Sequence, residues 1–98
     1  MVDIYEIVKK AAKTGKVERG VNEVTKALER GTAKLVIVAK DVNPKEIVQH
    51  LPILAKEKKI KLVEVDSKEK LGISAGIPVA ASAVAIINEG EADLSSIK

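Results

Sequence analysis

The sequence predicts a single α/β domain, a three-layer αβα sandwich built on a small mixed sheet of about four strands. Short apolar runs rich in Val and Ile, at 35–39, 61–65 and about 83–87, alternate with segments whose apolar residues recur every three or four positions. The chain is also short, with 98 residues of which 46% are hydrophobic. We therefore expect one modest core, formed by residues 1–98 as a single domain.

The first predicted helix covers about residues 3–14. Its apolar residues keep the spacing of one helix face, and Gly15 stands at the position that commonly follows a helix. A short connecting segment, 16–19, separates this helix from the next glycine.

The second predicted helix is short and covers about residues 22–30. Gly20 reads as a turn into an N-cap at Asn22, and Gly31 ends the helix. The run 35–39 that follows is continuous and rich in β-branched residues, which indicates a strand covered on both faces.

The third predicted helix has a strong start signal at 43–46, where Asn, Pro and Glu occupy the N-cap, N1 and N3 positions. Its apolar pattern continues through Ala55. Pro52 lies inside the pattern and is expected to kink or split the helix, because proline lacks the N–H that the preceding turn requires.

The last third of the chain is predicted to hold a strand at 61–65, a short helix capped by Ser67, and a final strand at about 83–87. Residues 88–90 turn into an acidic C-terminal helix that continues to Lys98. Three residues are expected to break the regular order before the final strand: Gly72, Gly76 and Pro78.

The composition excludes several classes of protein. With no cysteine there is no disulfide framework, thiolate zinc site or cysteine nucleophile. The first residues resemble no signal peptide, and no stretch has the roughly 18 apolar residues of a membrane span, so we expect a soluble cytoplasmic protein. The formal net charge of +3 is compatible with a polyanionic partner without requiring one.

An enzyme is disfavoured by the available side chains. His50 is the single histidine, and a structural or surface role explains it more simply than a catalytic triad. Asp41, Glu46 and His50 form too common a combination to indicate a metal. The glycines of 72–76 follow neither the dinucleotide-binding nor the phosphate-loop pattern. We expect no catalysis, no cofactor, no metal and no small-molecule substrate.

A cluster at the start of the second helix is the strongest indication of a site. Gly20 would let a ligand approach the backbone, and the helix start favours a phosphate. Asn22, Lys26 and Arg30 share one helix face, and Glu23 beside them would suit a ligand with donors, such as a guanine edge. The alternative is an ordinary helix with an Asn cap and a solvated basic face.

The loop before the final strand is a second candidate. Ile77, Pro78 and Val79 are apolar and follow a glycine, so they could cover an unstacked base. The alternative is that Ile77 packs under the sheet. Lys68 could add a phosphate contact, although an exposed lysine at that position requires no function.

Four stretches of this sequence resemble one family: 20–31 with the motif N-E-x-T-K, 33–44 with D-V-x-P, His50-Leu51-Pro52, and 85–91. The chain resembles, over nearly its whole length, the archaeal large-subunit ribosomal proteins of the L-seven-Ae family, and His50-Leu51-Pro52 is typical of the archaeal and eukaryotic branch of the superfamily. These are ribosomal proteins that bind kink-turns, and they lie within the broader L-thirty-e superfamily.

The resemblance implies binding to the kink-turn, a bent RNA internal loop with tandem sheared G·A pairs. By motif position, Asn22 and Glu23 would read the sheared guanines and Gly20 would allow close approach. By the same correspondence, three basic residues would contact phosphates, namely Lys26, Arg30 and Lys68. The specificity loop of the family, here Ile77, Pro78 and Val79, would pack on bases.

The partners that the resemblance implies are ribosomal RNA, box C/D and H/ACA guide RNA, ribonuclease P RNA and the core proteins of these particles. The helix carrying Ile47 to His50 is a candidate contact for such proteins. No membrane partner is implied, and we expect a monomer, because no large apolar stripe is left without an explanation.

Two positions depart from the family pattern. Val79 stands where eukaryotic relatives carry arginine, which indicates a more permissive loop, and Asn43 replaces an acidic residue. A protein-interaction module on the same fold, without RNA binding, is the main alternative function. A small hydrolase is a third and is disfavoured by the single histidine.

Overall fold

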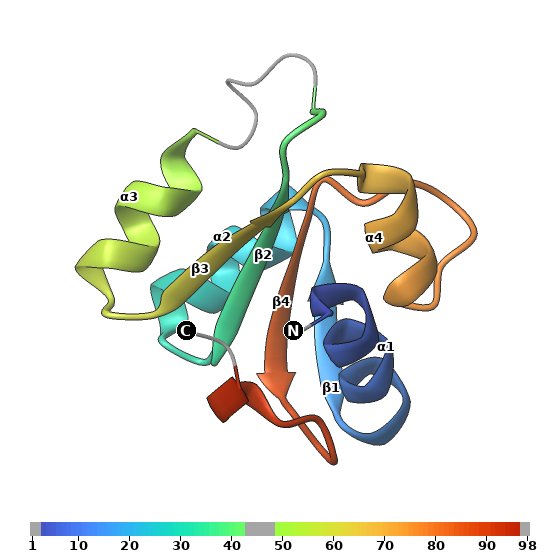
Figure 1. Ribbon diagram of the computed structural model, residues 1–98. Coiled ribbons are helices and arrows are strands. Elements are labelled where there is room, and N and C mark those ends of the chain that lie inside the picture. The colour runs from blue at the N-terminus through green and yellow to red at the C-terminus, as the bar shows by residue number, and fades with distance from the viewer. Residues whose placement is uncertain (1–2, 43–48, 97–98) are drawn as a thin grey trace.

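The computed structural model describes residues 3–42 and 49–96, and these form helices on both sides of a four-stranded sheet (Figure 1). The elements in chain order are α1 Ile4–Thr14, β1 Lys16–Arg19, α2 Val21–Arg30, β2 Leu35–Ala39, α3 His50–Glu57, β3 Lys61–Val65, α4 Lys68–Ser74, β4 Ala83–Asn88 and a 3-10 turn, η2, Leu94–Ser96.

The sheet is mixed, as predicted, with the strand order β1-β4-β2-β3. β2 and β3 run parallel, while β4 is antiparallel to both of its neighbours, β1 and β2. α1 packs against α4, and α2 packs against α3. Figure 1 shows α1 in front of the sheet and α2 behind it. None of the helices in the described ranges is long and apolar enough to cross a membrane.

The core is aliphatic and centres on the two inner strands. All five residues of β2 are buried, as are the first four of β4. Leu28 of α2, Leu51 of α3 and Leu71 of α4 are fully buried against them. Complete burial of each such side chain contributes roughly 1.5–3 kcal/mol, so the inner strands and the three helix leucines hold the layers together.

Several predicted elements are confirmed. The strands at 35–39 and 61–65 have the expected bounds, and α1 begins after Asp3, whose carboxylate accepts a hydrogen bond from Tyr5 N–H at 3.0 Å. Ser67 caps α4 as expected, accepting a hydrogen bond from Lys70 N–H at 3.2 Å.

The segment 16–19 is the fourth strand of the sheet, which the sequence pattern did not identify. It is an edge strand of four residues and only Val17 is buried, so its sequence carries too little apolar character to be distinguished from a loop. Pairing with β4 supplies the hydrogen bonds that define it.

Two predictions for the last third of the chain are wrong. Gly72 does not break the order but lies buried inside α4. The acidic C-terminal helix is replaced, within the described residues, by the short 3-10 turn at Leu94–Ser96. Before that turn, Glu91 N–H donates to Thr14 Oγ1 at 2.8 Å. The segment after β4 therefore packs at the C-terminal end of α1.

The predicted helix start at 43–46, with Asn43 and Glu46, lies outside the described residues, and so does Ile47. The described part of the third helix begins at His50, which places Pro52 in its first turn. The N–H groups of a first turn have no partner within the helix, so proline removes no hydrogen bond at this position.

The Tyr5 hydroxyl links α1 to the turn between β3 and α4. It donates a hydrogen bond to Asp66 Oδ1 and accepts one from Ser67 N–H at 3.1 Å. The bond from Tyr5 holds the pKa of Asp66 below its ordinary value. Partial burial, together with the bond to Asp66, raises the pKa of Tyr5.

We expect Tyr5→Phe to lower the melting temperature at neutral pH. The lowered pKa of Asp66 means that this contact stabilises the fold above the ordinary pKa of 3.8, and that the stabilisation is lost as the pH falls through the lowered value. Thermal unfolding of both proteins from about pH 7 to about pH 2 should therefore give converging curves in acid. A difference that stays constant over this range would contradict the prediction.

Candidate functional site

The start of α2 exposes backbone at one end of the sheet. Gly20 is the N-cap residue, with φ 94° and ψ 153°, a conformation that is nearly confined to glycine. Its N–H donates to Ala83 C=O at 2.9 Å. A Cβ at Gly20 would meet no atom within 4 Å, so the space in front of this backbone is open to a ligand.

Asn22 is not the N-cap, which corrects the sequence prediction. The helix begins one residue earlier, at Val21, and Gly20 makes no side-chain cap hydrogen bond. Asn22 lies on the second position of the helix with an exposed side chain, and its amide has no hydrogen-bond partner among the described residues. The explanation of Asn22 as a structural cap is thereby removed, and its amide is available to a ligand.

Glu23 follows Asn22 in the first turn of α2 and forms an exposed ion pair with Lys26 about one turn further on, with 3.6 Å between Glu23 Oε1 and Lys26 Nζ. Exposed pairs of this kind contribute about 0–1 kcal/mol. A ligand can therefore separate the two charges at little cost and engage each one.

A groove of about 170 Å³ runs between α2 and the edge strand β1. Three predicted site residues line it, namely Glu23, Lys26 and Arg30. Arg30 lies roughly 12 Å along the helix axis from Asn22, given 1.5 Å per residue, so the predicted row spans the whole helix and is not one compact cluster.

Sequence reasoning missed the opposite wall of this groove. Lys16 and Glu18 come from β1, and their charged groups lie 3.8 Å apart. No signal in the sequence pointed to these residues, because the pairing of β1 with β4 is what places them beside α2. The remaining lining residues are Ala27, Thr32 and Ile87.

The apolar loop forms a second part of the candidate site. We define the α4–β4 loop as residues 75–82, between α4 and β4 (Figure 1). Ile77 is half-buried and packs against the core, as the alternative explanation required. Pro78 and Val79 are exposed, Val79 by 63%, and so they are the two residues that offer an apolar surface to a ligand.

Lys68 begins α4 and is half-buried. Its backbone is fixed from two sides, since Lys68 N–H donates to Asp41 Oδ1 at 2.9 Å and Lys68 C=O accepts from Ala81 N–H at 3.0 Å. These two bonds connect the first residue of α4 with the end of β2 and with the α4–β4 loop.

Arg19 joins the start of α2 to the α4–β4 loop and was not identified from the sequence. Its Nε–H donates to Ala75 C=O at 2.7 Å, and the contact is partly buried. Arg19 directly precedes Gly20, so one side chain spans the space between the two parts of the candidate site. Segments 56 residues apart in the sequence are brought together in this way.

His50 has a structural contact with α2. Thr25 Oγ1 donates to Val21 C=O at 2.7 Å and lies 2.8 Å from His50 Nε2. The second contact joins the hydroxyl of Thr25 to the ring of His50. The histidine thus ties the first turn of α3 to α2, which agrees with the structural role expected for it.

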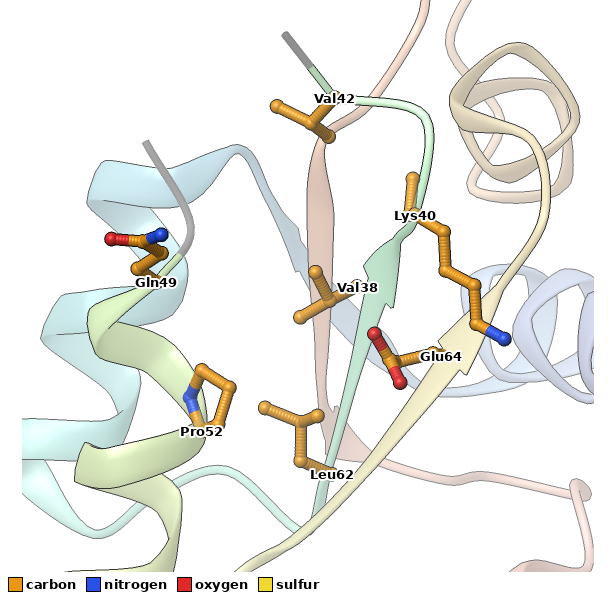
Figure 2. A pocket seen from close by; sticks show the side chains of 8 residues that line it. Val38, Lys40, Val42, Gln49, Pro52, Leu62 and Glu64 are labelled. Atoms are coloured by element: carbon orange, nitrogen blue, oxygen red, sulfur yellow. The ribbon is translucent and has the colours of Figure 1, made fainter. Parts of the chain in front are cut away.

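A second cavity, of about 340 Å³, lies between α3 and the strands β2 and β3 (Figure 2). Its described lining residues are Val38, Ala39, Lys40, Val42, Gln49, Pro52, Leu62 and Glu64. They include one amine, of Lys40, and one carboxylate, of Glu64, but no histidine or hydroxyl. Residues 3–42 and 49–96 contain no group of three or more His, Cys, Asp or Glu that could hold a metal ion.

The fold and the open, charged groove define a small α/β sandwich domain whose candidate site is a surface and not an enclosed pocket. The chain belongs to the ribosomal protein L7Ae/L30e/S12e/Gadd45 family, whose model matches residues 2–95.

A solved structure titled "Giardia lamblia 15.5kD RNA binding protein" is similar to this chain, with a TM-score of 0.80 and 36% sequence identity. The match covers 92% of this chain and 72% of that chain. Neither the family description nor this title names an enzymatic activity, in agreement with the expectation of a non-catalytic protein.

We expect Gly20→Ala and Asn22→Ala to separate the roles of these neighbours in stability. An alanine at the backbone angles of Gly20 should cost about 1–3 kcal/mol. Asn22→Ala should change the free energy of unfolding by less than about 0.5 kcal/mol, because no cap is lost. Chemical denaturation measures both values. A loss near 1 kcal/mol for Asn22→Ala would restore the capping role.

Proposed function

We propose that this protein binds RNA containing a kink-turn and stabilises the bent form of that RNA. The observation that carries the proposal is the exposed amide of Asn22, which has no hydrogen-bond partner among residues 3–42 and 49–96, at a helix start whose N-cap is a glycine. Asn22 and Glu23 would then read the edges of the sheared guanines, and the open backbone at Gly20 would allow the RNA to approach closely.

The remaining contacts are assigned to charged side chains along α2 and on α4, and to the α4–β4 loop. Lys26 and Arg30 on α2, with Lys68 on α4, would meet phosphates. Pro78 and Val79 would cover an unstacked base, and the half-buried Ile77 would support them from below. The similarity to the RNA-binding protein of Giardia lamblia and the membership in a ribosomal protein family support this assignment.

The mechanism is a shift of population. An internal loop that interconverts between an extended and a kinked form is drawn to the kinked form by the difference in affinity that the protein has for the two. No moving part of the protein is needed, so a rigid surface that is complementary to the kinked RNA is sufficient.

The cellular partners that we propose are the ribonucleoproteins whose RNA presents a kink-turn. They include the ribosomal large subunit, the box C/D and H/ACA guide particles and ribonuclease P, together with their core proteins. We propose that the protein acts there in the cytoplasm as a monomer. The assignment to the archaeal branch of the family also stays a prediction.

We expect Glu23→Ala and Lys26→Ala to weaken RNA binding in different ways. Loss of the Glu23 carboxylate should remove about 10- to 100-fold in affinity for a kink-turn RNA, the effect of a hydrogen bond to a charged group. It should leave a matched RNA with Watson–Crick pairs in place of the sheared G·A pairs nearly unaffected. Lys26→Ala should lower the affinity for both RNAs by a similar factor. Binding titrations at moderate salt measure the two affinities.

Two variants serve as controls. Glu29→Ala removes an exposed carboxylate from the same helix outside the groove, and Lys9→Ala removes an exposed charge from α1. Both should preserve the preference for the kink-turn. Equal weak binding of the wild-type protein to both RNAs would overturn the proposal and favour a protein-interaction module on this fold.

The salt dependence gives an independent check. With three or four phosphate contacts and a slope near −0.7 to −0.9 per contact, a fourfold rise in salt should weaken binding by about one to two decades. Lys26→Ala should reduce the slope by about one contact. A slope that is unchanged by this substitution would remove Lys26 from the phosphate contacts.

A further inference from the structure

We propose that Arg19 and Gly72 are positioning residues that hold the α4–β4 loop in the conformation that covers an unstacked base. This inference rests on the proposed function. It adds that recognition of the base depends on two residues that act through the loop. Arg19 holds the start of the loop against β1, which we call the clamp, and Gly72 lets the backbone of Val79 pack directly on α4, which we call the seat.

Arg19 clamps the beginning of the loop. Its Nε–H donates to Ala75 C=O at 2.7 Å, and its Nη2 lies 3.8 Å from the place where a Cβ of Gly76 would stand. Gly76 has φ +85°, so the chain turns sharply beside the guanidinium. The planar guanidinium fixes the direction of this hydrogen bond, which the flexible ammonium of a lysine does not.

Gly72 seats the middle of the loop. It is a buried residue inside α4, and a Cβ added there would lie 1.9 Å from Val79 C=O oxygen and 3.1 Å from Ala81 N. The backbone of Val79 therefore rests directly on the helix, at a distance that only glycine permits. A side chain at Gly72 would push Val79 outward.

Two backbone hydrogen bonds connect the same loop to α4. Ile77 N–H donates to Gly72 C=O at 3.1 Å, and Ala81 N–H donates to Lys68 C=O at 3.0 Å. Val79 lies between these bonds and is 63% exposed, so its side chain gains little support from the core. The clamp and the seat supply that support, and a surface fixed before binding loses less conformational entropy on association.

The test combines binding with hydrogen exchange. Arg19→Lys keeps the positive charge and removes the fixed hydrogen bond, Gly72→Ala displaces the seat, and Lys9→Gln is a control that removes a charge from α1. Each folded protein is titrated with a kink-turn RNA and with the same RNA carrying an abasic site at the unstacked nucleotide. Amide exchange is measured for Ile77 and Ala81, with Val84 in the core as the reference.

We expect the wild-type protein and Lys9→Gln to lose about tenfold in affinity on the abasic RNA, the effect of one lost base contact. Arg19→Lys should bind the intact RNA several-fold more weakly than the wild-type protein does. Its affinity for the abasic RNA should be about equal to that of the wild-type protein. The two losses are then not additive, as expected for groups that act through one loop. Gly72→Ala should behave in the same way.

The exchange data test the inference without RNA. Arg19→Lys should speed exchange at Ile77 and Ala81 by about tenfold while Val84 is unchanged, because local opening of the loop becomes easier. Unchanged exchange at both amides, or a full abasic penalty in Arg19→Lys, would overturn the positioning role. If the wild-type protein does not distinguish the kink-turn from its Watson–Crick control, the proposed function fails, and faster exchange in Arg19→Lys would still support the clamp.

Discussion

The hydrogen bond from Gly20 N–H to Ala83 C=O is the contact on which the candidate site depends. It ties the N-cap residue of α2 to the first residue of β4. The polar row of α2 and the end of the α4–β4 loop therefore start from one fixed point. Since Gly20 has a conformation that few other residues adopt, glycine at this position is a requirement of the fold as well as of the proposed RNA contact.

The distribution of burial explains how such a small domain can carry an open site. The inner strands β2 and β4 are covered on both faces by helices, and the core residues are aliphatic. No polar or charged residue in the described ranges is fully buried. Apart from Thr25, which contacts His50, the polar residues of α2 are exposed. Substitutions at Asn22, Glu23, Lys26 and Arg30 are therefore expected to alter binding with little effect on the core.

The two parts of the site differ in what holds them. The side chains of α2 inherit their positions from a regular helix anchored by Leu28 in the core. The α4–β4 loop has no such frame, and it relies on the Arg19 contact and on the close approach to Gly72. Rigidity of both parts is what selection of one RNA shape requires, because a compliant surface would accept the kinked and extended forms alike.

The sequence by itself determined the fold class, the inner strands and the residues of the helix that carries the candidate site. Continuous β-branched runs and helical spacing of apolar residues are local signals. They predict the elements correctly because the apolar residues of each pattern are the ones that the core buries. The motif around Asn22 and Glu23 is equally local. It resembles one family, and the chain belongs to the L7Ae/L30e/S12e/Gadd45 family.

Tertiary structure decided what those local signals could not. The edge strand at 16–19 exists because β4 pairs with it, and Gly20 replaces Asn22 as the cap because its N–H is held by Ala83. The sequence pattern predicts that Gly72 breaks a helix, yet Gly72 lies within α4. The backbone of Val79 occupies the space that a side chain at Gly72 would take. Such contacts join residues far apart in the chain, so their effect appears only when the sheet has brought them together.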